Sequence, residues 1–118
     1  MTINLFIHDQ ESKFFAAGEV IFQENEQGDI MYVILEGEVT IKVHGKEIDN
    51  LSKGEILGEM ALIQNDHIRS ATSVAKTDCK LAIVNQKRFL FLVQNTPYFA
   101  LEVMRIIAHR LRKMDEKV

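Results

Sequence analysis

The sequence of 118 residues has no tryptophan, a single proline and a single cysteine. The lone Cys79 cannot form an internal disulfide, so a disulfide-stapled scaffold is excluded. Because it lies in the apolar run 79–84, we interpret it as a small core residue, which fits a reducing compartment. No apolar run is long enough to cross a bilayer, and the N-terminus lacks the pattern of a signal peptide. These absences predict a cytoplasmic protein with no membrane partner.

A strong excess of positive charge is absent as well. Lysine and arginine number 14 against 17 acidic residues, and no basic block occurs before the C-terminal segment. A surface that follows the phosphate backbone of a nucleic acid needs such a block. We therefore expect no direct nucleic-acid partner. The length suits one domain over residues 1–118, with a single binding site.

The residue patterns of metal and catalytic sites are also missing. No two histidines have the i, i+2 spacing that places two ligands on one face of a strand; they are His8, His44, His67 and His109. This disfavours a metal-dependent cupin, the enzyme class that a β-rich sequence with histidines first suggests. No nucleophile elbow, cysteine–histidine context or framed pair of carboxylates is present. We expect no metal site, no cofactor and no enzymatic activity.

Residues 14–84 have the pattern of short strands separated by glycine turns. Val39, Ile41 and Val43 alternate with polar residues, and the following 44–46 segment predicts the tight turn of a hairpin. The apolar, β-branched runs 30–35 and 80–84 also indicate strands; both are too short for confident helices. Many short strands with turn signals about every 8–12 residues are typical of a sandwich or barrel. The pattern predicts a mainly β fold, a β-roll.

The periodicity changes after the last of these runs. Residues 86–94 are apolar enough for a short helix, and Asn95, Thr96 and Pro97 supply a stop, an N-cap and a proline suited to the first helical position. A longer helix then covers residues 97–117. We therefore expect the β-roll to carry helices at its C-terminal end.

The long helix has two apolar stripes. The first consists of Phe99, Val103 and Ile106. The second steps by three and four residues as a coiled-coil seam does, through Met104, Ile107, Leu111, Met114 and Val118. Two arrangements fit this pattern. Either both stripes pack on the same roll, or the second meets the helix of another copy and forms a homodimer.

The stretch GEMALIQNDHIRSAT, residues 58–72, places Glu59 and Arg69 at the two ends of a mostly uncharged segment. A glycine–acid pair alone is not diagnostic, because five of the six glycines precede an acid. Here, however, a helical turn follows, and such a turn begins with free N–H groups that attract anions. Arg69 precedes the small residues Ser70 and Ala71, which leave room for a ligand. A simple ion pair between Glu59 and Arg69 is the structural alternative.

The charges of this segment limit the ligand. One guanidinium with a few N–H groups and the Ser70 hydroxyl suits a singly charged phosphodiester. A triphosphate calls for a Walker loop and a magnesium site, which the sequence lacks. Glu59 would repel the phosphate and is better used to accept a hydrogen bond from a sugar hydroxyl. The residues therefore predict a ribose that carries a singly charged phosphate.

The segments 58–62 and 69–72, together with the earlier glycine-rich segments 15–21 and 28–37, resemble the cyclic nucleotide-binding domain family. The resemblance covers nearly the whole chain. It implies an eight-stranded, jelly-roll-like β-roll with flanking helices, and it identifies residues 58–72 as the phosphate-binding cassette of that family.

The resemblance also implies a role for each residue of the site. Glu59 accepts the ribose 2′-hydroxyl, while Arg69 and Ser70 hold the cyclic phosphate. The cassette helix is shaped by Gly58, Met60 and Ala61, and the base lies beside Ile41 and Ile48. Arg110 of the long helix reaches Glu59, as in regulators of the catabolite-activator type. Ala71, next to Ser70, is the small residue that leaves room for the ligand.

The chain departs from those regulators in two respects. It stops before the position of their DNA-binding domain, and Met114 and Asp115 stand where they use hydroxyl side chains to touch the adenine. The resemblance also implies cAMP over cGMP, because cGMP-selective members of the family often carry threonine at the position of Ser70. We expect a regulatory module that binds a cyclic nucleotide, moves its C-terminal helices and signals to a protein partner not identifiable from the sequence. The alternative is a ligand-free β-roll that serves interaction or dimerisation.

Overall fold

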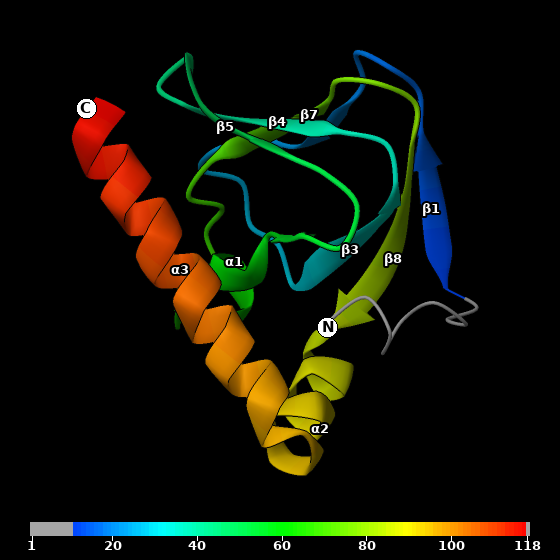
Figure 1. Cartoon of the computed structure of the whole chain (residues 1–118), viewed down its shortest axis with the longest axis vertical. Coiled ribbons are helices and arrows are strands. Elements are labelled where there is room, and N and C mark those ends of the chain that lie inside the picture. Colours follow the sequence, from blue (N-terminus) through cyan, green and yellow to red (C-terminus); the bar gives the residue numbers. More distant parts are fainter. Residues whose placement is uncertain (1–10, 118) are drawn as a thin grey trace.

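The computed structural model describes residues 11–117, and within them eight strands form two antiparallel sheets of four strands each (Figure 1). The strands are β1 (Ser12–Phe15), β2 (Val20–Phe22), β3 (Ile30–Glu36), β4 (Val39–Val43), β5 (Lys46–Leu51), β6 (Ile56–Leu57), β7 (Thr72–Ala75) and β8 (Cys79–Asn85). One sheet has the order β1-β8-β3-β6 and the other β2-β7-β4-β5. The first and last strands pair directly, with Ser12 opposite Ala82. The predicted mainly β fold with C-terminal helices is confirmed.

The hairpin of β4 and β5 follows the sequence pattern closely. Val39, Ile41 and Val43 are buried, as their alternation predicts. His44 and Gly45 have φ values of 52° and 78°, so both residues of the turn are left-handed, the geometry that matches the twist of a two-residue hairpin.

Strand β3 separates two hydrophobic clusters because its side chains alternate between the faces of its sheet. Met31 and Val33 point to a cluster shared with the helices, whereas Tyr32 and Ile34 belong to the cluster inside the roll. Cys79 is buried in this inner cluster, as predicted. The helices thus pack on the outside of one sheet, and the inside of the roll has its own core.

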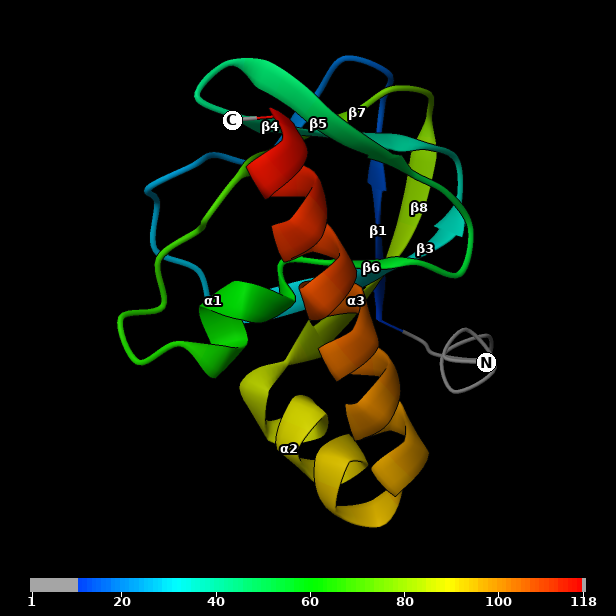
Figure 2. The same ribbon diagram turned by 60° about the vertical axis from the view of Figure 1, so that its left-hand side comes forward.

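Three helices flank the roll: α1 (Glu59–Ile63), α2 (Gln86–Asn95) and α3 (Pro97–Lys117). The side chain of Asn85 caps α2 by accepting a hydrogen bond of 2.8 Å from the N–H of Arg88. The α2 and α3 helices form a hairpin below the sheets, and α3 then runs back past α1 toward β5 (Figures 1 and 2). None of the helices within residues 11–117 is long and apolar enough to cross a membrane.

The structure divides the two apolar stripes of α3 differently from the sequence pattern. Phe99 and Val103 of the first stripe are buried against the roll and α2. Ile107 of the second stripe also packs on this cluster, whereas Met104 and Leu111 are 60% and 47% exposed. The second stripe is therefore divided: Ile107 packs on the roll, as in the first of the two predicted arrangements, while Met104 and Leu111 lie outward. The side chain of Met114 and the whole of Val118 lie outside the described part of the structure.

Candidate functional site

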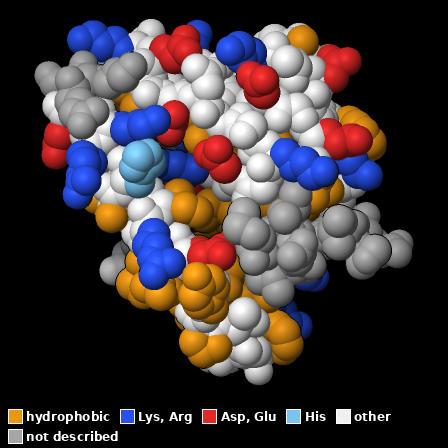
Figure 3. Space-filling model, in the orientation of Figure 1, with side chains coloured by type: hydrophobic (Ala, Val, Ile, Leu, Met, Phe, Trp, Pro, Cys, Tyr) orange, Lys and Arg blue, Asp and Glu red, His pale blue; other side chains and the backbone are white. Residues whose placement is uncertain are grey.

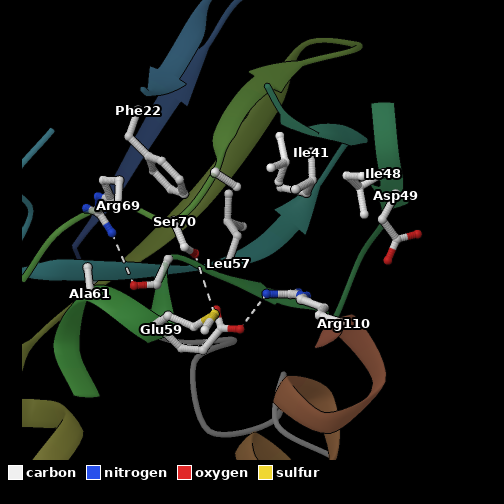
Figure 4. A pocket seen from close by; sticks show the side chains of 14 residues that line it. Phe22, Ile41, Ile48, Asp49, Leu57, Glu59, Ala61, Arg69, Ser70 and Arg110 are labelled. Atoms are coloured by element: carbon white, nitrogen blue, oxygen red, sulfur yellow. Dashed lines mark hydrogen bonds and ion pairs between the residues drawn. The ribbon is translucent and has the colours of Figure 1, made fainter. Parts of the chain in front are cut away.

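A pocket opens where the roll meets α1 and α3, and it encloses about 540 Å³ of space, part of it continuous with solvent (Figure 4). The pocket is lined by all ten residues predicted from the sequence: Ile41, Ile48, Gly58, Glu59, Met60, Ala61, Arg69, Ser70, Ala71 and Arg110. Four further lining residues were missed: Phe22, Val43, Asp49 and Leu57. The structure thus gathers the predicted residues in one place, while their role in binding stays a prediction.

Gly58 begins the short helix of the cassette and is required there for two reasons. Its φ of 83° is left-handed, a conformation in which a side chain is strained. A Cβ at this position would also lie 2.7 Å from Nη1 of Arg69 and 3.2 Å from the ring of Phe22. The glycine therefore allows the helix to start directly against the arginine.

Arg69 is fixed at one end of the pocket although it is almost fully buried, with 4% of its surface exposed. Its Nη1 donates to the carbonyl oxygen of Gly58 at 3.1 Å, and its guanidinium lies 4.2 Å from the ring centre of Phe22. No other hydrogen bond of its side chain is formed within residues 11–117. Burial lowers the pKa of Arg69, and the nearby Tyr32 and carboxylates oppose this effect.

Glu59 is 1% exposed and forms an ion pair with α3. Its Oε1 accepts a hydrogen bond of 2.6 Å from Nη1 of Arg110, whose Nη2 donates to the carbonyl oxygen of Ile56. The structural alternative raised by the sequence, an ion pair between Glu59 and Arg69, is therefore wrong. The contact between Arg110 and the pocket glutamate, implied by the family resemblance, is present.

The remaining cassette residues leave donors near Arg69. Ser70 is exposed, and its hydroxyl donates weakly to the sulfur of Met60 at 3.5 Å. His67, with a left-handed φ of 55°, places its Nδ1 2.8 Å from the carbonyl oxygen of Ala61 and so ties the loop to α1. This contact holds the loop that carries Arg69 beside the helix that carries Glu59.

The other end of the pocket is apolar and is closed by a charged pair. Ile41 and Ile48 form its wall, and Asp49 lies beside them, away from Arg69 (Figure 4). Oδ1 of Asp49 accepts a hydrogen bond of 2.8 Å from Nζ of Lys113. The α3 helix is thus tied to the pocket twice, at Glu59 and at Asp49.

The register of the second sheet places Ser73 between two lining residues. Ser73 lies opposite Phe22 on one neighbouring strand and opposite Ile41 on the other. Its side chain is fully buried, and its hydroxyl has no hydrogen-bond partner within the described residues. A buried hydroxyl of this kind costs stability in the absence of a partner.

The pocket combines a buried cation, a carboxylate and an apolar wall. No group of three or more histidine, cysteine, aspartate or glutamate residues able to hold a metal ion occurs within residues 11–117. The arrangement suits a small anion that carries hydroxyl groups and a flat apolar ring.

Comparisons with known proteins agree with this chemistry. Residues 12–96 match the family model of the cyclic nucleotide-binding domain. The chain is 28% identical to the cAMP-activated global transcriptional regulator CRP of Salmonella typhimurium over 99% of its own length, and it spans 58% of the length of that relative.

Solved structures with the same fold include a catabolite activator protein and an enzyme. The catabolite activator protein of Thermus thermophilus superposes with a TM-score of 0.81 at 26% identity, covering 98% of this chain and 56% of that one. The cAMP-bound form of an EAL enzyme superposes with a TM-score of 0.67 at 35% identity, covering 91% of this chain and 29% of that one. The cGMP-bound form of the same enzyme superposes with a TM-score of 0.68 at 34% identity, covering 91% and 30%.

Proposed function

This chain belongs to the cyclic nucleotide-binding domain family, and on that premise we propose that it is a regulatory module that binds cAMP in this pocket and moves α3 in response. cGMP is the competing ligand, since a solved relative carries either nucleotide. The likeness to a transcription regulator supports a regulatory, non-enzymatic role in the cytoplasm, with signalling through an unidentified protein partner. The lack of an excess of positive charge supports the absence of direct contact between this domain and nucleic acid.

The incomplete pairing of Arg69 is the observation that carries the proposal. Its buried guanidinium donates within the described residues to one neutral acceptor, the carbonyl oxygen of Gly58. Burying a cation is costly without a hydrogen-bonded counter-charge, so an anion that reaches Arg69 is strongly favoured. The single charge of a cyclic phosphodiester matches the single guanidinium, and the exposed hydroxyl of Ser70 adds a donor beside it.

The other two parts of the nucleotide have matching partners. Oε1 of Glu59 is taken by Arg110, whereas Oε2 has no partner within residues 11–117 and can accept a hydrogen bond from the ribose 2′-hydroxyl. The base then lies against the apolar wall of Ile41 and Ile48. Arg110 of α3 and the ribose contact the same carboxylate, so the contacts of the ligand depend on the position of α3. Such a difference between two helix positions is what couples ligand binding to helix movement.

The exposed side of α3 supports a homodimer as the second part of the proposal. Leu101, Met104 and Leu111 are exposed apolar residues at spacings of three and seven along this helix. Such a row suits packing against the same helix of a second copy. A movement of α3 would then be transmitted to the partner subunit.

Ligand-dependent thermal unfolding tests the binding function. Wild type and Arg69→Ala are unfolded with saturating cAMP, cGMP or AMP, and Arg112→Ala, which removes an exposed arginine, serves as the matched control. A ligand at a hundred times its Kd stabilises the folded state by about 2.7 kcal/mol. We expect cAMP to raise the midpoints of wild type and Arg112→Ala, and to leave that of Arg69→Ala nearly unchanged.

The same experiment decides between the two functions. If neither cyclic nucleotide moves the wild-type midpoint, the binding function is rejected in favour of a ligand-free interaction or dimerisation module. If AMP is as effective as cAMP, the site recognises a phosphate without selecting the cyclic diester.

A further inference from the structure

Phe22 is directed into the pocket by an irregularity of its own strand. Neighbouring residues of a regular strand point to opposite faces of the sheet. Ile21 and Phe22 nevertheless both pack against the hydrophobic cluster inside the roll. The register between β2 and β7 shifts between Val20 and Phe22, an irregularity of the β-bulge kind, and bulges redirect side chains beside functional sites. Phe22 is thereby placed next to Arg69, at the end of the pocket away from Asp49 (Figure 4).

The ring of Phe22 is held on two sides. It stacks on the ring of Tyr32, with the ring centres 6.4 Å apart and the planes 14° apart. Tyr32 is buried and is held in turn by an edge-to-face contact with Phe15. On the other side, a Cβ on Gly58 would lie 3.2 Å from the ring, so the glycine lets the backbone of the cassette approach Phe22 closely. The ring is therefore a fixed part of the pocket before any ligand arrives.

The guanidinium of Arg69 lies over this ring. Its Cζ is 4.2 Å from the ring centre, a distance typical of a cation–π contact. The aromatic face attracts the cation from one side and leaves the edge of the guanidinium, where its N–H groups point, uncovered. One N–H group donates to the carbonyl oxygen of Gly58, and no carboxylate forms an ion pair with Arg69 within residues 11–117. The ring thus stabilises the positive charge and leaves the remaining donors open to a ligand.

The carboxylates around Arg69 make this contact important for binding. The charges of Asp29, Glu26 and Glu59 act on the guanidinium, although none of them forms an ion pair with it within the described residues. A guanidinium that is free to turn can pair with one of them, and a phosphate must then displace that carboxylate. A ligand binds only the fraction of molecules that is ready for it, so such a competing arrangement raises the apparent Kd.

Resting on the proposed function, we propose that Phe22 is a positioning residue for the phosphate site. Its ring face holds Arg69 by the cation–π contact, in place of a counter-charge, and so keeps the unused N–H groups for the phosphate. An aliphatic side chain would fill the same space without attracting the cation. A carboxylate would attract the cation but would occupy its donors. An aromatic ring attracts the cation and leaves the donors free.

Fluorination of the ring separates this role from packing. Phenylalanine with an increasing number of ring fluorines keeps nearly the same shape, but each fluorine withdraws electron density from the ring face and weakens the attraction for a cation. These residues are incorporated site-specifically at position 22, and cAMP is titrated calorimetrically into each protein. The same series at Phe89, a buried ring of the cluster shared with the helices, is the matched control. Thermal unfolding without ligand establishes that each protein is folded.

We expect the Kd for cAMP to rise stepwise with fluorination at position 22, by about tenfold for the most fluorinated ring, as the strength of a buried cation–π contact allows. Phe22→Leu, which has no ring, should weaken binding at least as much. The Phe89 series should keep the Kd within about twofold of wild type, because this ring is not part of the pocket lining. A purely structural role of Phe22 would not produce the stepwise dependence on fluorination.

A second measurement detects the contact without any ligand. The free energy of unfolding is measured in urea for wild type, Phe22→Leu, Arg69→Met and the double variant. Because the cation–π contact joins the two side chains, we expect their effects to be non-additive. Additive effects would show that the ring does not hold the guanidinium, and the positioning role would be rejected.

The titrations distinguish failure of this role from failure of the proposed function. If wild type does not bind cAMP, the proposed function fails and the role of Phe22 in phosphate binding fails with it. If wild type binds cAMP but the Kd does not follow fluorination at position 22, or if the Phe89 series changes the Kd equally, the positioning role is rejected while cyclic nucleotide binding stands.

Discussion

Arg69 shows how a single residue prepares the pocket for an anion. Gly58 on one side and Phe22 on the other fix its guanidinium before any ligand is present, so little side-chain freedom is left to lose on binding. The same contacts depend on the planar shape of the group. A lysine at this position would keep the positive charge but lose the planar, two-pronged set of N–H donors (the fork) of the guanidinium.

The variant Arg69→Lys separates charge from geometry. We expect the Kd for cAMP to rise at least tenfold, because each charged hydrogen bond that is lost contributes about 1.5–3 kcal/mol. Calorimetric titration measures this change, and Arg112→Lys is the control at an exposed position. An unchanged Kd in Arg69→Lys would mean that the positive charge suffices without the fork.

Ser73→Ala tests the orphaned hydroxyl. Removing a buried donor that has no partner should raise the free energy of unfolding by about 1 kcal/mol, since alanine has nearly the same shape. Urea denaturation measures the change. A loss of stability would indicate that the hydroxyl has a partner, such as a bound water.

Cys79 gives a prediction for the dependence of stability on pH. Burial raises the pKa of the Cys79 thiol, although the side chain of Thr77 opposes this effect. The thiol of the unfolded chain ionises near pH 8.5, whereas the thiol of the folded chain keeps its proton to a higher pH. The free energy of unfolding is therefore unaffected by this group below about pH 8.5 and falls as the pH rises above it. Urea denaturation at several pH values should show this loss in wild type, relative to Cys79→Ala. Equal pH profiles would contradict it.

At the residue scale, the sequence predicted the charged centre of the site better than its surroundings. Glu59 and Arg69 are recognisable because they stand at the two ends of a mostly uncharged segment, and because small residues follow Arg69. Phe22 and Asp49 gave no comparable signal, since an aromatic in a strand suggests core and an acid in a strand suggests solvent. Only the folded register brings them into the pocket.

At the scale of elements, α3 is the part that connects the pocket to the outside. It contacts the roll through the apolar residues Phe99 and Val103 near its start, and through Arg110 and Lys113 near its end. The two charged residues are three positions apart and therefore lie on the same face of the helix. The latter half of the helix is thus held mainly by ion pairs, which a ligand can rearrange more easily than a core.

The pair of Arg110 and Glu59 is suited to a double-mutant cycle. Arg110→Met leaves Glu59 as a buried, uncompensated charge and should lower the free energy of unfolding by about 3–5 kcal/mol. Adding Glu59→Gln to this variant should recover a large part of the loss, because the buried charge is removed. Urea denaturation of both single variants and the double variant measures the coupling. Purely additive effects would show that the pair does not stabilise α3.

Some features of the strands and helices could be predicted from local sequence patterns, and others could not. The β4–β5 hairpin and the α2–α3 boundary follow from local signals, a turn at His44 and Gly45 and a proline at position 97. The outward face of α3 could not be assigned from periodicity, because two stripes of similar strength fit the helix. Its orientation is set by residues distant in sequence, including Met31 and Val33 of β3.

At the scale of the whole molecule, hydrophobic side chains are exposed around the α2–α3 hairpin (Figure 3). The exposed residues of this surface are Leu90 and Phe91 of α2 and Tyr98, Leu101 and Met104 of α3. An apolar surface of this kind on one side of a molecule is typical of contact with another protein. The residues on α3 can serve the proposed homodimer, for which about 800 Å² per subunit is a usual contact area.

Sedimentation of two matched variants tests this homodimer. Met104→Glu places a charge on the outward side of α3 and should shift the protein toward monomer, because a charge buried in the contact has no counter-charge. Phe91→Glu makes the same kind of change on α2, outside the proposed contact, and should leave the assembly as in wild type. A wild-type monomer both with and without cAMP would reject the homodimer.

The pairing of the first strand with the last sets the order in which the molecule can be completed. β1 can find its neighbour only when the ribosome has made residue 82, and Glu59 gains its cation only when residue 110 has followed. Such distant contacts fold slowly, on the order of milliseconds to seconds. A nascent chain therefore carries every cassette residue before the ion pair between Glu59 and Arg110 can form and close the pocket against α3.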